Sequence, residues 1–266
     1  MNKLSGIFIY PVKSLLGFEA DAWPVRPEGL AYDRKWMLLD ENGKFLTQRK
    51  IPMMCRLQAR IEKGKLIISD LRGEQADLIE PADYNQSESL QKVTVWSDDT
   101  VGFEVSKEAD EWFSNALEIK CKLVRQPDGA ERIHQRFESK KLVSFADSQP
   151  FLIVGTASLD ELNSRIDSKV RMNRFRPNLV IETQKPYEED SWTKFNIGDL
   201  PIQKTKLCAR CKVVNIEQET GDESLKILNV LSDYRKENGE VNFGIRAKCS
   251  QLPNEIQVKK GDLLSF

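Results

Sequence analysis

Residues 35–47, KWMLLDENGKFLT, show the pattern that the first half of the chain repeats. Residues 35–39 are largely apolar and read as a strand, and the turn-forming residues DENG follow at 40–43. An Asn-Gly step accepts the positive φ angles that a tight hairpin turn requires. Residues 44–47 therefore read as the returning strand of a β-hairpin.

The same pattern recurs along the first 125 residues. A strand is expected at residues 4–10, stopped by Pro11. Ser106 resembles a helix N-cap, because acidic residues and apolar residues at helical spacing follow it. The other expected elements are hairpins at 57–61 with 65–68 and at 92–96 with 101–105 around a turn at Ser97-Asp98-Asp99, and a strand at 122–125. Short strands separated by turn signals favour a sandwich or barrel.

The second half mixes strands with short helices. Ser158 has the capping-box spacing that begins a helix, which we expect to run to Ile166. A second short helix is expected at residues 225–234. The expected strands are residues 151–154, 179–181, 195–197, 200–207, 213–216 and 263–266, the last one preceded by a turn at 258–262.

Residues 126–141 interrupt this pattern, because they contain Pro127-Asp128-Gly129 and no apolar period. They read either as a linker or mobile loop over a site, or as a solvated surface loop. We therefore place a β-rich domain carrying one helix at residues 1–125 and a second domain at 126–266. The expected fold class is mainly β with some α.

Composition limits the chemistry. The chain has 266 residues, 40 basic and 41 acidic side chains, five cysteines and one histidine. A net charge of −1 argues against a general nucleic-acid binder. One histidine excludes a His-rich metal site, and any Ser-His-Asp or Cys-His mechanism would need His134. An odd number of cysteines excludes a complete disulfide framework.

The expected location is the cytoplasm. The N-terminal apolar stretch is too short for a signal peptide, and no apolar run approaches the roughly 18 residues of a membrane helix. Unpaired thiols are typical of a reducing compartment. We therefore expect no membrane association and no nucleic-acid partner.

Cys208-Ala209-Arg210-Cys211 is the strongest local motif, and several interpretations of it remain open. A redox dithiol normally begins a helix, whereas this motif lies between two expected strands. A structural zinc or iron–sulfur site needs further cysteines at suitable spacing. The other possibilities are one thiolate bound to a soft metal, with Arg210 nearby, or two packed structural cysteines.

Other polar segments stand at the ends of expected strands. Each of them alone is also compatible with an ordinary surface turn or ion pair. Lysine, arginine and hydroxyl groups in such positions suit an anionic ligand such as a phosphate. Because Arg176 precedes a proline, an extended backbone is expected there. The segments supply Lys13 and Ser14, Arg34, Asp147 and Ser148, and Arg176 with Asn178. His134 reads as solvated or as a proton shuttle.

Taken in order, these segments resemble one family. The motifs are YPVKS at 10–14, YDRKW at 32–36, DSQPFLIVGTASLDELNSRI at 147–166, NRFRPNLVI at 173–181, EDSW at 189–192, IGDL at 197–200, CARC at 208–211, NFG at 242–244 and KGDLL at 260–264. The sequence resembles the MOSC-domain proteins with an N-terminal MOSC β-barrel domain. That branch includes the mitochondrial amidoxime-reducing component and its bacterial relatives. The resemblance implies a β-barrel-like MOSC domain in the second half.

The resemblance also implies a bound molybdenum cofactor, Mo-molybdopterin. Cys211 falls on the family's protein ligand to molybdenum, and Cys208 then becomes a supporting thiol. Asp147 becomes a catalytic candidate for proton delivery. The implied cofactor-binding residues are Lys13, Ser14, Arg34, Asp147, Ser148, Arg176, Asn178, Arg210 and Cys211.

The implied activity is two-electron reduction of small N-hydroxylated compounds, such as amidoximes, hydroxylamines or N-hydroxylated bases. No cluster-binding cysteine run is visible, so the electrons are expected from a separate ferredoxin-, flavodoxin- or cytochrome-type donor with its reductase. Gln149 and Arg246 differ from the residue types expected near the cofactor in mitochondrial members. The alternatives are a non-catalytic carrier of the cofactor or its sulfur, and a metal-free anion-binding module.

Overall fold

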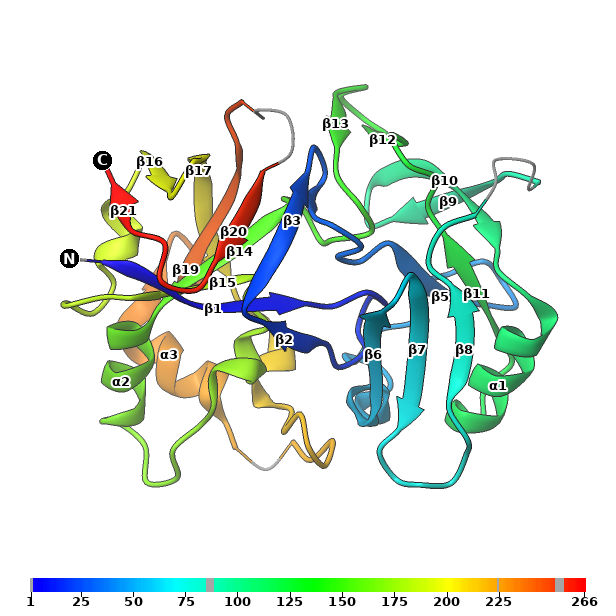
Figure 1. Ribbon diagram of the computed structural model, residues 1–266. Coiled ribbons are helices and arrows are strands. Elements are labelled where there is room, and N and C mark those ends of the chain that lie inside the picture. Colours follow the sequence, from blue (N-terminus) through cyan, green and yellow to red (C-terminus); the bar gives the residue numbers. More distant parts are fainter. Residues whose placement is uncertain (1, 85–88, 224, 252–255) are drawn as a thin grey trace.

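The computed structural model describes residues 2–84, 89–223, 225–251 and 256–266, and Figure 1 shows two groups of strands side by side. The helix α1 (Lys107–Leu117) lies at one end of the molecule, and α2 (Thr156–Asn163) and α3 (Ile227–Arg235) lie toward the other. The described residues are mostly strands, which confirms the expected fold class.

The larger group is a nine-stranded sheet. Its strands in order are β2 (Phe18–Ala20), β1 (Lys3–Ile9), β15 (Leu179–Glu182), β14 (Phe151–Gly155), β19 (Glu240–Cys249), β17 (Leu200–Ala209), β16 (Lys194–Ile197) and β21 (Leu264–Ser265), and β18 (Lys236–Glu237) pairs with β19. Only β14 and β15 pair in parallel among these neighbours within the described residues. Strand β1 therefore crosses from the start of the chain into a sheet made mainly by its second half.

The other group consists of a six-stranded sheet and a three-stranded meander. The six strands are β5 (Trp36–Asp40), β11 (Cys121–Arg125), β10 (Asp98–Glu104), β9 (Gln91–Val95), β12 (Glu131–His134) and β13 (Lys140–Leu142), and the meander is β6 (Leu57–Glu62), β7 (Lys65–Asp70) and β8 (Leu78–Pro81). A smaller sheet joins β20 (Gln257–Lys259), β3 (Ala22–Arg26) and β4 (Gly29–Leu30). Single-turn 3-10 helices connect these parts: η1 (Pro52–Arg56), η2 (Met172–Phe175), η3 (Glu188–Ser191) and η4 (Lys212–Asn215).

Helix α1 forms where the sequence predicts it. The Ser106 hydroxyl accepts a hydrogen bond from the Ala109 N–H at 2.9 Å, which satisfies one of the free donors of the first turn. Ala109, Phe113 and Leu117 then fall on one buried face, because residues three to four apart share a face of a helix. They join the apolar core under β5 and the β6–β8 meander.

Two hairpins of the first half differ in detail from the prediction. The third hairpin turns at Trp96 and Ser97, because Val95 pairs with Asp98, so Asp98 and Asp99 belong to β10. The first hairpin closes through the Leu39–Phe45 bridge, and residues 44–47 form no regular strand. Residues 126–141 are also more regular than expected, since β12 and β13 pair as a hairpin there.

The second half also corrects three expectations. Ser158 lies inside α2, and Gly155 occupies the N-cap position. Glu189, which is fully buried, accepts hydrogen bonds from the Gly155 N–H and from the Ser158 hydroxyl, so the helix start is capped from η3. Residues 213–216 were expected to be a strand, but they belong mostly to η4. Strand β19, the longest in the sheet with β17, was not predicted at all.

Candidate functional site

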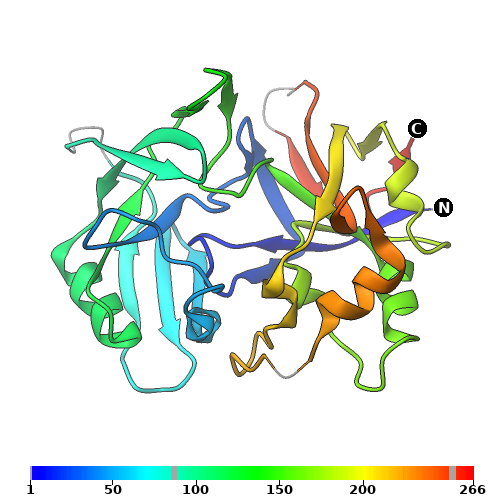
Figure 2. The ribbon, with the colours of Figure 1, turned by 180° about the vertical axis from the view of Figure 1, so that it is seen from behind.

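One cavity is lined by polar residues from both groups of strands. Figure 2 shows the two groups from behind. Segments after β1 and β5 supply one wall, and segments around β14, β15, β17 and β19 supply the other. Eight of the nine predicted cofactor-binding residues line it: Lys13, Ser14, Arg34, Asp147, Arg176, Asn178, Arg210 and Cys211. Ser148 is not among the lining residues, and neither is His134, which lies on the β12–β13 hairpin.

The charge of this cavity is strongly positive. Among the described residues, its lining includes Lys13 and six arginines but only one carboxylate, Asp147. The arginines are Arg34, Arg49, Arg174, Arg176, Arg210 and Arg246. Such an excess of cations at close quarters favours an anionic ligand.

Lys13 is held at the cavity by the start of the chain. Its backbone N–H, two residues after Pro11, donates to the Trp36 carbonyl oxygen at 2.8 Å. Its ammonium donates to the Phe145 carbonyl oxygen at 2.8 Å and to Asp147 Oδ1 at 2.7 Å. Burial lowers the pKa of Lys13 to about 8, and the Asp147 carboxylate limits the fall. The lysine is therefore cationic at neutral pH and close to losing its proton.

Asp147 is the carboxylate that contacts several of the cationic side chains of the cavity. Besides Lys13, the Arg49 and Arg246 guanidinium groups lie 3.8 and 3.9 Å from Oδ2. Withdrawal from water raises the pKa of Asp147, but Lys13, Arg246 and Arg49 outweigh it and hold that pKa well below its usual range. Asp147 is thus an ionised carboxylate that contacts a protonated lysine.

Two arginines enclose Tyr10. The guanidinium carbons of Arg34 and Arg176 lie 4.3 and 4.4 Å from the centre of its ring. Arg34 also pairs with Asp33 at 2.6 Å, whereas no carboxylate pairs with Arg176 among the described residues. Burial lowers the pKa of Arg176 to about 10, which leaves it charged at neutral pH.

The backbone at Arg176 differs from the expectation. A residue before proline favours an extended conformation, yet Arg176 has φ 52° and ψ 45°. The 3-10 helix η2 ends there, and the Arg176 N–H donates to the Asn173 carbonyl oxygen at 3.1 Å. Closing that turn places the residue in the left-handed region, from which its side chain lines the cavity.

The two cysteines of the CARC motif have different surroundings. Cys208 is 1% exposed and packs in the apolar core beneath α3. Cys211 is partly exposed, lines the cavity, and its sulfur accepts a hydrogen bond from Arg49 Nε at 3.2 Å. Of these two cysteines, only Cys211 presents its sulfur to a ligand in the cavity.

Arg210 is held by two hydrogen bonds, but one of its donor atoms has no partner among the described residues. Its Nε donates to the Phe243 carbonyl oxygen at 2.8 Å and its Nη1 to the Phe175 carbonyl oxygen at 3.0 Å. Its Nη2 is buried and has no hydrogen-bond partner within the described part of the chain. A buried donor without a partner is costly, so this atom marks a place for an acceptor from a ligand.

Sequence reasoning missed four lining residues that also carry polar groups: Thr47, Gln48, Arg49 and Arg174. Arg49 matters most, because it joins the Cys211 sulfur to the Asp147 carboxylate. It follows the first hairpin in the sequence QRK at 48–50, which carries no local signal of a site. Only the approach of the two halves of the chain reveals it.

Known proteins share both halves of the chain. Residues 1–120 match the family described as the MOSC N-terminal beta barrel domain, and residues 140–265 match the MOSC domain. The mitochondrial amidoxime-reducing component 1 of Mus musculus is 30% identical over 246 residues, which cover 88% of this chain and 72% of the mouse protein. The chain belongs to the MOSC family. This confirms the resemblance that the ordered motifs indicated.

Other MOSC relatives are much longer. The molybdenum cofactor sulfurases of Oryza sativa subsp. japonica and Solanum lycopersicum are 34% and 31% identical to the chain. Each match covers 91% of this chain and 32% of the sulfurase. The chain therefore spans about a third of the length of these sulfurases. Within the described residues, no helix has the length and apolar character needed to cross a membrane.

The Lys13 ammonium of this MOSC protein gives a testable pH dependence. We expect the cofactor-free protein to bind sulfate, which keeps its charge from pH 7 to 9, about tenfold more weakly at pH 9 than at pH 7. The anion binds best when Lys13 is protonated. Because the pKa of Lys13 is about 8, most of the free protein lacks this proton at pH 9 and must take one up in order to bind the anion, which weakens binding. Calorimetric titration at both pH values measures the ratio.

Lys13→Met and Lys194→Met are matched variants for that measurement. Lys194 is exposed on β16 and does not line the cavity. Lys13→Met is expected to bind sulfate weakly with little pH dependence, and Lys194→Met to behave like the wild type. An unchanged pH dependence in Lys13→Met would show that another group controls binding.

Proposed function

We propose that this protein is a molybdenum-cofactor-dependent oxidoreductase that reduces N-hydroxylated compounds with electrons from a separate redox partner. The observation that carries the proposal is the partly exposed Cys211 sulfur at a cavity with seven cationic side chains. The amidoxime-reducing component among its relatives supports the reaction class. The electron donor would be of the ferredoxin, flavodoxin or cytochrome type, with its own reductase.

The donor set of the cavity fits this cofactor. A phosphorylated pterin is anionic, and Lys13, Arg34, Arg176 and the unpartnered Nη2 of Arg210 would hold it. The thiolate of Cys211 is the soft ligand that molybdenum takes from a protein. When bound, the cofactor supplies the two-electron redox chemistry, while the protein provides orientation, charge and protons.

Asn178 has a different part in this arrangement. Its Oδ1 accepts a hydrogen bond from the Leu152 N–H at 3.2 Å, and its Nδ2 donates to the Phe8 carbonyl oxygen at 3.3 Å. These contacts join β14 to β1 across the cavity wall. We therefore assign Asn178 to shaping the wall that faces the pterin.

Proton supply is the chemical task of Lys13 and Asp147. Reduction of an N–OH group consumes two electrons and two protons, and it yields an N–H group and one water. Asp147 is ionised, so it carries no proton of its own, but its Oδ1 accepts a hydrogen bond from the Lys13 ammonium. We propose that the Lys13 ammonium donates one proton to the departing oxygen, that Asp147 keeps this ammonium charged and oriented through their hydrogen bond, and that solvent supplies the second proton.

Metal analysis and a turnover assay test this proposal together. Protein from a host that makes the cofactor is expected to contain about one molybdenum per chain and to reduce benzamidoxime to benzamidine with a chemical electron donor such as reduced viologen. Molybdenum without turnover of any N-hydroxylated substrate, combined with reconstitution of a cofactor-free enzyme, would favour the carrier. A protein without molybdenum that binds only anions would contradict both.

A further inference from the structure

Trp96 lies at the tip of the β9–β10 hairpin, beside the cavity. Trp96 is 47% exposed, which is unusual for such a large apolar side chain. Its backbone has φ 58°, in the left-handed region that only a small share of residues other than glycine adopt. The tight turn at Trp96-Ser97 requires this conformation, and it directs a large aromatic group where Asn or Gly is more usual.

The indole contacts two residues that line the cavity. Its Nε1 donates a hydrogen bond to Asp147 Oδ1 at 3.1 Å. The Arg49 guanidinium carbon lies 4.4 Å from the ring centre, and the same arginine donates to the Cys211 sulfur. Trp96 therefore contacts Asp147 directly, and only the Arg49 side chain connects it to the Cys211 sulfur.

A second aromatic ring extends this surface. Phe45, from the first hairpin, meets Trp96 edge to face, with ring centres 4.9 Å apart. The Lys13 ammonium lies 5.4 Å from the centre of the Phe45 ring. The rim of a cationic cavity thus carries two rings, and nearly half of the larger one faces solvent.

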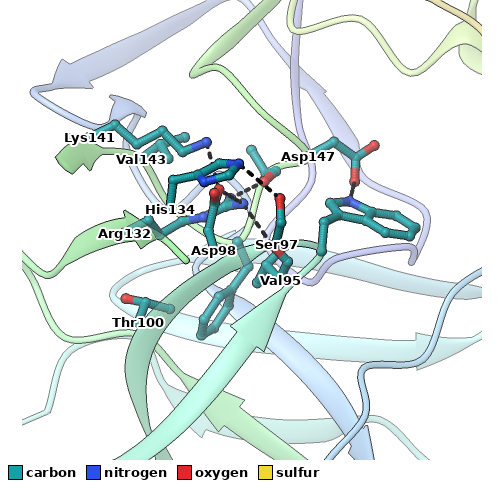
Figure 3. Close-up of polar contacts among 12 residues, drawn as sticks. Val95, Ser97, Asp98, Thr100, Arg132, His134, Lys141, Val143 and Asp147 are labelled. Carbon is teal, nitrogen blue, oxygen red and sulfur yellow. Dashed lines mark hydrogen bonds and ion pairs between the residues drawn. The ribbon is translucent and has the colours of Figure 1, made fainter. Parts of the chain in front are cut away.

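A buried ion pair behind the hairpin holds Trp96 in place. Arg132 of β12 has no exposed surface, and its Nη2 donates to Asp98 Oδ2 at 2.6 Å, two residues after Trp96. Lys141 of β13 pairs with the same carboxylate at 2.6 Å (Figure 3). Asp98 is therefore held by two cationic side chains of the β12–β13 hairpin, in the region 126–141 that was expected to be a linker or loop.

Arg132 also reaches the segment that carries Asp147. Its Nη1 donates to the carbonyl oxygens of Ser144, at 3.1 Å, and of Ala146, while its Nη2 lies 3.3 Å from the Val95 carbonyl oxygen. One buried guanidinium thus binds Val95, the residue before Trp96 (Figure 3), and also Ala146, the residue before Asp147. Arg132 therefore connects the segment that carries the indole to the segment that carries the carboxylate.

We propose that Trp96 is a specificity-determining residue whose exposed indole surface binds the planar aromatic part of an N-hydroxylated substrate while the N–OH group enters the cavity. The proposal rests on the proposed function and adds a substrate class, amidoximes and related compounds conjugated to an aromatic ring. A flat ring loses apolar surface to water when it packs on indole, whereas a small aliphatic amidoxime has no ring to place there.

Two substrates and three variants test it. Benzamidoxime and acetamidoxime carry the same reacting group and differ in the ring. In Trp96→Ala, KM for benzamidoxime is expected to rise about tenfold and KM for acetamidoxime to stay within about twofold. Any change in kcat from the lost hydrogen bond to Asp147 should be the same for both substrates. Trp96→Phe should keep most of the preference. Phe137→Ala removes another exposed aromatic side chain, one outside the cavity lining, and should behave like the wild type.

Calorimetric binding of benzamidoxime to the same proteins keeps the two ideas separable. If the wild type reduces both substrates and Trp96→Ala keeps the wild-type ratio of their KM values, the inference is wrong and the function stands. If the wild type reduces neither substrate, the proposed function is wrong, and the role of Trp96 is then tested by the binding of benzamidoxime alone. Binding of benzamidoxime that Trp96→Ala weakens about tenfold supports it, and binding that is absent or unchanged overturns it.

Discussion

Cys211→Ser is expected to lower N-reductive turnover by more than about 100-fold and to reduce the molybdenum content of the purified protein. A serine hydroxyl is a harder and far less acidic ligand than a cysteine thiol, so a soft metal loses its protein bond. The fold should be little affected, because Cys211 is partly exposed and its sulfur contacts Arg49. Elemental analysis, turnover of benzamidoxime and the unfolding temperature measure the three effects.

Cys249→Ser is the matched control for that experiment. Cys249 ends β19, is partly exposed, and packs against the core of the large sheet instead of lining the cavity. Its substitution should leave molybdenum content and turnover near the wild-type values. Wild-type turnover in Cys211→Ser, with the donor supplied in excess, would refute the assignment of this residue as the ligand.

The second large effect concerns stability and arises from Gly244. This residue lies in β19 with φ 76°, at a bulge where β19 places an extra residue against β17. A Cβ atom there would lie 2.6 Å from the Ile153 carbonyl oxygen. Gly244→Ala is therefore expected to lower the free energy of unfolding by about 3 kcal/mol, from backbone strain and overpacking together. Denaturant titration measures it.

Gly239→Ala separates the two causes. Gly239 also has a positive φ, 83°, but apart from its two chain neighbours no described residue has an atom within 4 Å of a Cβ built on it. Its substitution should cost only the backbone strain, about 1 kcal/mol. Equal losses in the two variants would show that contact with Ile153 contributes nothing, and that β19 shifts without penalty.

The same bulge explains part of the candidate site. Phe243, next to Gly244, offers its carbonyl oxygen to Arg210, and its ring stacks on Phe175 with centres 4.3 Å apart. The loss of stability in Gly244→Ala should thus be accompanied by weaker anion binding at Arg210. The sequence NFG does not reveal the close packing at Gly244, because the Ile153 carbonyl that it approaches lies about 90 residues earlier in the chain.

The elements that local sequence determines were predicted well. Helix α1 is confirmed, because Ser106 caps it and its apolar residues repeat at helical spacing. The β6–β7 hairpin is also confirmed. Its turn residues and its strand pattern lie close together in the sequence, so local residues determine it. Ser158 shows the limit, because Glu189 takes over the start of α2 from 31 residues away.

The candidate site shows the same division. Motif order led to Lys13, Arg34, Arg176 and Cys211, and the structure brings all four to one cavity. It did not lead to Arg49 or to the aromatic rim. These residues lie in or just after hairpins, and they contact Lys13, Asp147 and Cys211 only when distant parts of the chain meet.

The position of β1 has a consequence for how the chain acquires its structure. Lys3 pairs with Glu182, and its neighbour Leu4 donates a backbone hydrogen bond to Asp262. During synthesis one edge of β1 can pair early with β2, but its other edge must wait for about 180 residues until β15 is made, and its surroundings are complete only after about 260. Contacts between residues so far apart in sequence form slowly. The first strand to be made is thus among the last to be completely paired, and one of its edges stays open until the second half of the chain has been synthesised.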